Sequence, residues 1–292
     1  MNILVLSISG YRRPRPSNTA ALTVFIDFFL VFCKKNGRTI VIRNLSKLKY
    51  KAYLYVMNPT AQLYLLPVPL SETNVETIPQ YNREIIGQIK FFIVERTRTA
   101  RRFIRKLAPK VVIDDLTFFE LNKRTTPDEL AQMLHPIRQG HNVGLMSEAG
   151  CPGVADPGAI IVSMAHKAGI IVNPLVGPSS LLLALMGSGM NGQSFSFHGY
   201  LPAKKELLVP VLRKLEQVSR QTGAAQIFIE TPYRNQQIIT QSILSLSANT
   251  QLTIAADLTT PTQYIVTKTM AQWKKNPPDD LHKRPVVFIL QA

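Results

Sequence analysis

From residue 57 onward, short runs of β-branched and other apolar residues alternate with longer segments in which apolar residues recur every three or four positions. This alternation predicts an α/β fold with mostly parallel strands. The expected strands are residues 63–68, 91–94, 111–113, 142–146, 194–198, 226–229, 252–255, 263–266 and 286–290. The expected helices are residues 98–106, 127–139, 157–167, 180–186, 206–219 and 234–246. The first group of elements ends near Pro174, which predicts two α/β domains, residues 57–173 and 174–292.

Residues 1–56 differ from the rest of the chain in charge. They hold ten lysines and arginines but only one acidic residue, Asp27, and so supply +9 of the net charge of +16. A strand pattern begins soon after Met57, which favours translation from that methionine and an upstream basic extension that is not native. A native basic extension that binds RNA or a membrane surface is the alternative.

The apolar run of residues 21–33 is too short to span a membrane, because it covers 13 residues and includes Asp27, whereas a span needs about 20. No small-residue cleavage site follows it, so a secretory signal is not expected. Two cysteines, Cys33 and Cys151, cannot build a disulfide framework, and the five histidines have no zinc-ligand spacing. We therefore expect a cytoplasmic protein with neither a metal nor membrane contact.

The densest glycine and proline pattern is the stretch GLMSEAGCPGVADPG at residues 144–158. It follows an expected strand and predicts a rigid loop at the carboxyl end of that strand, where open α/β sheets bind ligands. Gly150 and Gly153 leave bare backbone against which a ligand can lie. The stretch has neither the G-x-G-x-x-G fingerprint nor a P-loop lysine. Asp156 followed by Pro157 is explained more simply as a helix start, with Asp156 as the N-cap.

Residues 147–158 (SEAGCPGVADPG) resemble the signature loop of the small-subunit rRNA (cytidine-2'-O)-methyltransferase family, a branch of the tetrapyrrole methylase superfamily. Three further motifs follow in the order found in that family: NPLVGPSS, FHGYLPAKK and ETPYR, which begin at Asn173, Phe197 and Glu230. Weaker similarities are ERTR from Glu95 and ADLTT from Ala256. The resemblance covers residues 62–292.

This resemblance implies a two-domain tetrapyrrole-methylase-like fold, a homodimer and S-adenosylmethionine bound in the cleft between the domains. It assigns cofactor contacts to Pro67, Ser147, Glu148, Ala149, Gly150, Cys151, Val154, Gly177, Ser179 and Ser180. One departure is that a Gly-Asn pair of the family after the first strand is absent here, where the sequence reads PVPLS from Pro67.

Methyl transfer requires alignment of the nucleophile with the activated methyl group and few catalytic side chains. A hydroxyl nucleophile still gains from a nearby base, and Glu95 and Glu230 are the candidates at motif positions. Each carboxylate ends an apolar run, so a structural ion pair with Arg98 or Arg234 is the alternative. Glu148 and Asp257 are further carboxylates at motif positions.

Basic residues near these motifs predict contacts with RNA phosphates. The candidates are Arg98, Arg101, Arg102, Lys204, Lys205 and Arg234. Ala256 and Thr260 stand where the family has basic residues. The favoured function is S-adenosylmethionine-dependent methylation of a ribose 2'-hydroxyl in small-subunit rRNA. A tetrapyrrole or other small molecule as the acceptor, and an inactive cofactor-binding homologue, are the alternatives.

Overall fold

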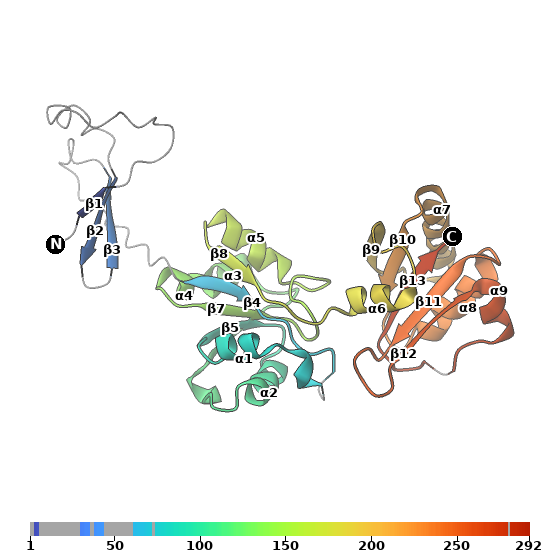
Figure 1. Ribbon diagram of the computed structural model, residues 1–292, viewed down its shortest axis with the longest axis horizontal. Coiled ribbons are helices and arrows are strands. Elements are labelled where there is room, and N and C mark those ends of the chain that lie inside the picture. The colour runs from blue at the N-terminus through green and yellow to red at the C-terminus, as the bar shows by residue number, and fades with distance from the viewer. Residues whose placement is uncertain (1–2, 6–29, 36–37, 44–60, 72–73, 280) are drawn as a thin grey trace, which may run out of the picture. The chain divides into compact units, whose positions relative to one another are not determined.

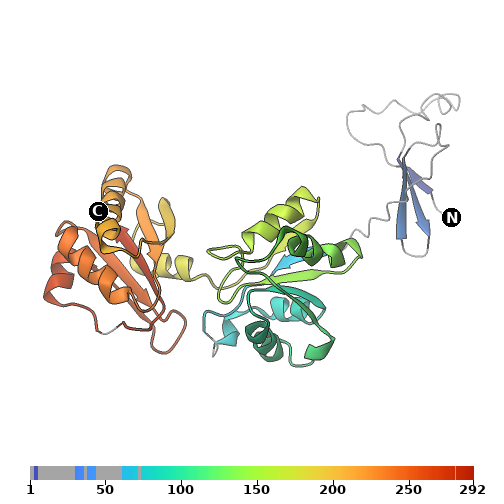
Figure 2. The same ribbon diagram turned by 180° about the vertical axis from the view of Figure 1, so that it is seen from behind.

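The computed structural model describes residues 3–5, 30–35, 38–43, 61–71, 74–279 and 281–292 (Figures 1 and 2). The chain divides into two compact units, Met1–Ala61 and Gln62–Ala292. The first contains an antiparallel sheet of β1 (Ile3–Val5), β2 (Leu30–Lys35) and β3 (Arg38–Arg43), in that order. The other residues of the expected extension lie outside the described ranges, so its role and boundary remain predictions. Within the described ranges, no helix has the length and apolarity to cross a bilayer.

The second unit begins with a sheet whose neighbouring strands are all parallel, in the order β6-β5-β7-β4-β8. Its strands are β4 (Gln62–Leu65), β5 (Phe91–Val94), β6 (Thr117–Glu120), β7 (Val143–Met146) and β8 (Ile171–Pro174). The intervening helices are η2 (Val75–Thr77), α1 (Gln80–Ile86), α2 (Thr97–Leu107), η3 (Ile113–Asp115), α3 (Pro127–Met133), α4 (His135–Arg138) and α5 (Ala159–Lys167). Figure 1 shows α1 and α2 on one side of this sheet and α3 and α5 on the other.

A second sheet follows, in the order β12-β11-β13-β10-β9. Its strands are β9 (Phe195–Tyr200), β10 (Ala225–Ile229), β11 (Gln251–Ala256), β12 (Tyr264–Thr269) and β13 (Val286–Gln291). The helices are α6 (Ser180–Ser188), α7 (Lys205–Thr222), α8 (Asn235–Ser245) and α9 (Met270–Lys275). One core cluster joins α7, α8 and α9 to this sheet around the fully buried Trp273, and another joins α6 to it around Ala184.

The expectation of mostly parallel strands is correct for the first sheet and wrong for the second. Only the β9–β10 pair is parallel there, and the pairs of β10 with β13, β11 with β13 and β11 with β12 are antiparallel. For β11 and β12 the reason is local, because a loop as short as residues 257–263 can join only antiparallel neighbours, whereas a parallel pair needs a crossover of a dozen or more residues. The two antiparallel pairs of β13 depend on contacts distant in sequence.

Two local expectations are also corrected, and three elements were missed. Residues 111–113 are not a strand, since Ile113 starts the short helix η3 and the strand is β6, which begins after the acidic pair Asp114 and Asp115. Residues 127–139 form α3 and α4 with a break at Leu134, because Pro136 cannot donate the hydrogen bond that would continue the helix. The strand β8 and the helices α1 and α9 were not expected.

Candidate active site

The loop after β7 has a backbone that side chains larger than glycine would strain. Gly150 has φ 74° and Gly153 has φ 85°, both in the left-handed region, and Ala155 adopts φ 62°. A short antiparallel bridge anchors the loop: Val68 N–H donates to the carbonyl oxygen of Gly150 at 2.9 Å, and Gly150 N–H donates to that of Val68 at 3.1 Å. A Cβ atom on Gly153 would meet no atom within 4 Å, so space is open beside this residue.

The segment after β8 packs against the segment after β4. A Cβ atom on Gly177 would lie 2.2 Å from Cβ of Pro67, so only glycine fits there. Cys151 approaches the same turn, with its Sγ 3.4 Å from the carbonyl oxygen of Pro178. Burial raises the pKa of the Cys151 thiol, which keeps it neutral and suits a packing role. The structure therefore brings Pro67, Gly150, Cys151 and Gly177 together.

The remaining predicted cofactor residues occupy the same two loops. Ser147 is buried, and its hydroxyl donates to the carbonyl oxygen of Gly150 at 3.3 Å. Glu148 is half-buried, whereas Ala149 and Val154 are exposed. The half-buried Ser179 and Ser180 start α6, with Ser179 at the N-cap and no capping hydrogen bond from its side chain.

Asp156 is not the N-cap of α5, because that position belongs to Gly158. Its carboxylate instead closes the loop, accepting hydrogen bonds from the N–H groups of Gly153 at 2.8 Å and Gly158 at 2.6 Å. Burial raises the pKa of Asp156, and these two hydrogen bonds oppose the rise. The helix begins two residues later than the sequence pattern predicts because this turn comes first.

Glu95 lies where β5 ends, beside the loop after β7. Its Oε1 accepts a hydrogen bond from the N–H of Glu148 at 3.0 Å. Burial raises the pKa of Glu95; the hydrogen bond opposes this, and the nearby carboxylates of Asp156 and Glu148 add to it. A carboxylate with a raised pKa at the carboxyl edge of a parallel sheet is suited to accepting a proton.

Glu230 is held in an ion pair. Its side chain is completely buried, and Oε2 lies 2.9 Å from Nη1 of Arg234. Oε1 accepts a hydrogen bond from the N–H of Thr231 at 2.7 Å, and Nη2 of Arg234 donates to the carbonyl oxygen of Pro202 at 2.8 Å. The geometry favours the structural alternative for both Glu230 and Arg234, because the pair ties the end of β10 to the segment before α7.

Five arginines and lysines lie on α2, but they are not equivalent. Arg98 and Arg105 are exposed, opposite the buried face of Ala100 and Ile104. Arg101 pairs with Asp114, with Nη2 at 2.6 Å from Oδ1. Arg102 is half-buried, and Lys204 and Lys205 are exposed at the start of α7.

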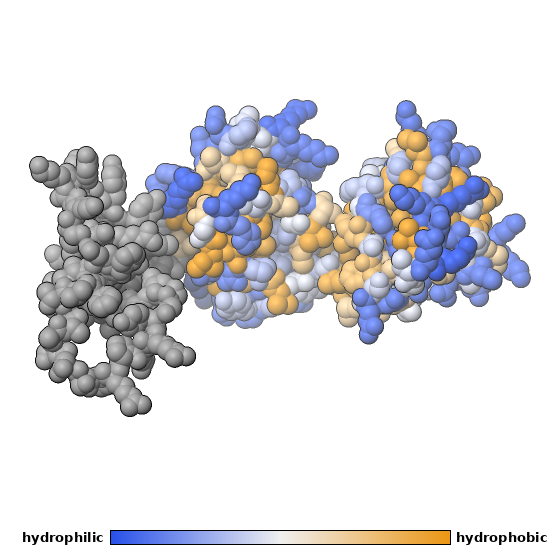
Figure 3. Space-filling model, turned by 90° about the horizontal axis from the view of Figure 1, so that it is seen from above, coloured by the Kyte–Doolittle hydropathy of each residue, from blue (hydrophilic) through white to orange (hydrophobic). Residues whose placement is uncertain are grey.

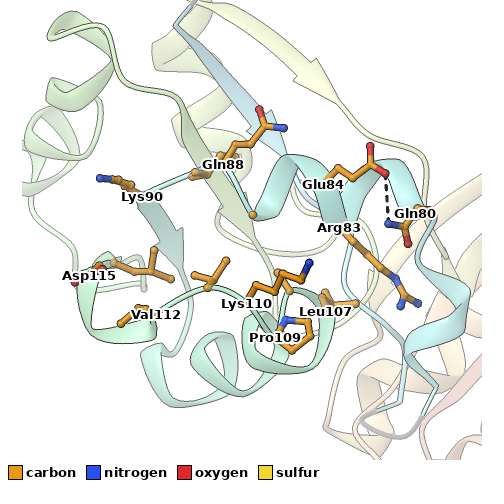
Figure 4. A pocket seen from close by; sticks show the side chains of 15 residues that line it. Gln80, Arg83, Glu84, Gln88, Lys90, Leu107, Pro109, Lys110, Val112 and Asp115 are labelled. Atoms are coloured by element: carbon orange, nitrogen blue, oxygen red, sulfur yellow. Dashed lines mark hydrogen bonds between the residues drawn. The ribbon is translucent and has the colours of Figure 1, made fainter.

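A groove of about 810 Å³ lies at the amino ends of strands β5 and β6 in the first sheet (Figure 4). It is lined by residues that precede β5 and β6, among them Lys90, Lys110 and Val112. Ligands of open α/β sheets bind at the carboxyl ends of the strands, whereas this groove lies at the amino ends. We therefore place the candidate active site at the loop after β7 and not in the groove.

Two side chains that no sequence motif indicates contact the loop between β11 and β12. Asn74 Nδ2 donates a hydrogen bond to the carbonyl oxygen of Thr259, in the loop between β11 and β12. Arg284 Nε donates to Oδ2 of Asp257 at 2.7 Å in the same loop. Neither Asn74 nor Arg284 lies in a motif. The contact of Asn74 joins positions 185 residues apart and that of Arg284 joins positions 27 residues apart, so no local sequence pattern predicts them.

Comparison with known structures identifies the fold. A crystal structure of the methyltransferase CobJ matches with a TM-score of 0.54 at 15% identity, covering 80% of this chain and 95% of that chain. The chain therefore shares the α/β fold of that protein. No model of a known protein family matches the chain.

Relatives found by sequence identify the family. Ribosomal RNA small subunit methyltransferase I of Vibrio cholerae is 30% identical over 204 residues, which are 70% of this chain and 67% of that protein. The protein of the same name from Buchnera aphidicola is 25% identical over 239 residues, 81% of this chain and 80% of the relative. The chain belongs to the ribosomal RNA small subunit methyltransferase I family, and the resemblance in its motifs is confirmed.

Proposed function

We propose that this protein transfers a methyl group from S-adenosylmethionine to a ribose 2'-hydroxyl of small-subunit rRNA. One observation carries the proposal: the Glu95 carboxylate accepts the N–H of Glu148, which places a proton acceptor against the glycine-rich loop. The names of the relatives give the class of acceptor, small-subunit rRNA.

The loop after β7 fits a cofactor bound mainly through the backbone. Gly150 and Gly153 carry no side chain and have positive φ angles, so a ligand can approach the backbone of this loop closely, and the space beside Gly153 is open. Residues 147–151 and 177–180 would hold the cofactor. When bound, S-adenosylmethionine supplies an activated methyl group on a positively charged sulfur.

Glu95 would act as the general base. Glu95 would accept the proton of the 2'-hydroxyl as its oxygen bonds to the methyl carbon, and the electron pair of the carbon–sulfur bond that breaks would stay with the sulfur. Burial raises the pKa of Glu95, which makes its carboxylate a better proton acceptor than an exposed one.

The acceptor requires a surface for phosphates, and α2 offers one. Arg98 lies in the first turn of the helix, three residues after Glu95 along the chain, and Arg105 lies two turns further on the same face. A cationic face that starts at the site of reaction positions an RNA strand through its phosphates.

We further propose a homodimer that works in the cytoplasm, where small ribosomal subunits are found. Exposed apolar side chains on α6, Leu182 and Met186, supply surface that a partner copy would cover, and apolar side chains also reach the face drawn in Figure 3. No cluster able to hold a metal ion is found among the residues that the structure describes, and no step proposed here uses one.

Incorporation of labelled methyl groups tests the proposal. Small subunits from a strain that lacks the gene should accept methyl from labelled S-adenosylmethionine, and nuclease digestion should recover the label as a 2'-O-methylnucleoside. Label on a base would overturn the assigned acceptor atom. Label on a tetrapyrrole and none on RNA would favour the small-molecule alternative, and no transfer despite cofactor binding would favour the inactive homologue.

A further inference from the structure

The loop between β11 and β12, residues 257–263, has a backbone that costs free energy to maintain (Figure 1). Asp257 has φ 48° and Thr259 has φ 68°, and a β-branched residue in this region is an outlier. The Thr259 hydroxyl is also buried, and no hydrogen-bond partner is found for it among the described residues. Two unfavourable features at one residue indicate that this conformation serves something other than the stability of the loop.

Arg284, which lies just before β13, holds this loop in place. Its Nε donates to Oδ2 of Asp257 at 2.7 Å, and its Nη2 donates to the carbonyl oxygen of Thr262 at 2.7 Å. The Thr262 hydroxyl donates to the same carboxylate oxygen of Asp257 at 3.1 Å. Hydrogen bonds with charged partners are about twice as strong as neutral ones, so one guanidinium fixes both ends of the loop.

The loop also connects to the candidate cofactor site. Asn74 Nδ2 donates to the carbonyl oxygen of Thr259. Leu70 packs against the core cluster that contains Leu258, and its Cδ2 lies 3.3 Å from where a Cβ atom on Gly150 would be. Thr259 is therefore only a few contacts away from the loop after β7.

The charge of the loop limits what it can recognise. Residues 257–263 include no lysine or arginine, and the guanidinium of Arg284 is already bonded to Asp257 and Thr262. The hydroxyls of Thr260 and Thr262 already donate to Asp257, which leaves the Thr259 hydroxyl without a partner among the described residues. A neutral hydroxyl can bond to a base edge or to a ribose hydroxyl.

We propose that residues 257–263 form a specificity-determining element for the acceptor nucleotide, in which the Thr259 hydroxyl bonds to the sugar or base. Arg284 acts through the loop as a positioning residue. The inference rests on the proposed methylation of RNA, and it adds residues 257–263 to the residues that would contact the acceptor.

Substitutions of Thr259 distinguish the effect of its strained backbone on stability from the effect of its hydroxyl on RNA binding. Thr259→Gly adopts φ 68° without steric cost, so the thermal midpoint should stay equal or rise. The KM for small subunits should rise at least tenfold, while the Kd for S-adenosylmethionine stays unchanged. Thr259→Ser keeps the hydroxyl and should restore the KM to within about threefold of the wild-type value.

Lys283→Gly is the matched control, because Lys283 is another non-glycine residue with a positive φ, 63°, and lies in the turn before β13. It should raise the midpoint and leave methyl transfer unchanged. Arg284→Lys keeps the charge but loses the forked contact, and should raise the KM for RNA without changing cofactor binding.

Wild-type transfer kinetics in Thr259→Gly would overturn this inference and leave the proposed function standing. A rise in KM that Thr259→Ser fails to reverse would also overturn it. A wild-type protein that methylates no RNA would overturn the proposed function and this inference together.

Discussion

A Cβ atom on Gly177 would lie 2.2 Å from Cβ of Pro67, so the two residues pack at a distance that only glycine permits. This contact fixes the turn after β8 against the segment after β4, and Cys151 packs on the same turn from the loop after β7. Three chain segments at one edge of the sheet thus form a preformed backbone surface. A ligand that binds a preformed surface loses less free energy to ordering of the protein.

Gly150→Val should abolish binding of S-adenosylmethionine. Valine at φ 74° is strained by about 1–2 kcal/mol, and its Cβ would lie 3.3 Å from Cδ2 of Leu70 and 3.4 Å from the carbonyl oxygen of Pro178, so it would displace the two loops assigned to the cofactor. Gly169→Val is the control, because Gly169 has φ 68° at the end of α5 and no atom lies within 4 Å of its Cβ position. It should lose similar stability and bind normally in calorimetry. Equal affinity in both variants would remove the loop from the site.

Glu95→Gln should lower kcat by about 10²–10⁴, the usual contribution of a general base. Glu120→Gln is the control, because Glu120 lies on the neighbouring strand β6 beside Val94, and its hydrogen bond to Thr97 N–H lowers its pKa. That variant should keep a normal kcat in single-turnover transfer. A fully active Glu95→Gln protein would show that orientation alone suffices for the reaction.

The stability of the fold should respond to pH through Glu95. Its pKa is raised in the folded state, so the protonated carboxyl favours folding, and this contribution is lost as pH rises through the folded pKa. Glu95→Gln should therefore be at least as stable as the wild type at pH 7, with the difference disappearing at a pH below the ordinary carboxyl value. Urea unfolding at the two pH values measures this, and a variant that is less stable at pH 7 would contradict the assigned cause.

The alternation of strands and helices predicted β4, β5 and β7 of the first sheet, because these are short and mostly buried apolar runs, such as Phe91–Val94, but it missed the more exposed β6 and β8. It failed for residues 111–113, where apolar residues cover the core from a short helix and not from a strand. The antiparallel second sheet was also missed, since the position of β13 between β10 and β11 depends on contacts distant in sequence.

In the candidate site, too, local features could be predicted from the sequence and contacts between distant residues could not. The loop at residues 147–158 was visible because glycine and proline specify local backbone, whereas the contact of Asn74 with Thr259 was not. Sequence left two possible roles for Glu230. Geometry favours the ion pair, because the Arg234 guanidinium lies 2.9 Å from the completely buried carboxylate.

Glu230→Gln should destabilise the protein by about 3–5 kcal/mol, because it leaves the mostly buried Arg234 without its counter-charge. Asp114→Asn breaks an exposed pair with Arg101 and should cost at most about 1 kcal/mol. Urea unfolding of both variants measures the difference. Equal small losses would reopen a catalytic role for Glu230.

Replacing Arg98 and Arg105 with alanine should weaken RNA binding without changing cofactor affinity. If each contacts one phosphate of a single strand, the slope of log K against log salt should become shallower by about 1.4. The control replaces Lys274 and Lys275, two exposed lysines on α9, with alanine and removes the same charge elsewhere. Equal slopes in the two double variants would show that α2 acts only through net charge.

A chain that begins at Met57 should keep the thermal midpoint and the transfer activity of the full chain. The reason is that residues 62–292 form a compact unit with its own two sheets. Differential scanning calorimetry of both chains tests this. A midpoint lower by several degrees would show that the basic extension stabilises the second unit.

Methyl transfer to small ribosomal subunits tests the central claim most directly. Subunits from a strain lacking the gene should be incubated with labelled S-adenosylmethionine and either the wild-type protein or Glu95→Gln, and the RNA should be analysed by mass spectrometry. We expect one 2'-O-methylated nucleotide per subunit with the wild type, formed at least a hundredfold more slowly with the variant. Subunits that remain unmethylated by a wild-type protein shown to bind the cofactor would contradict the account.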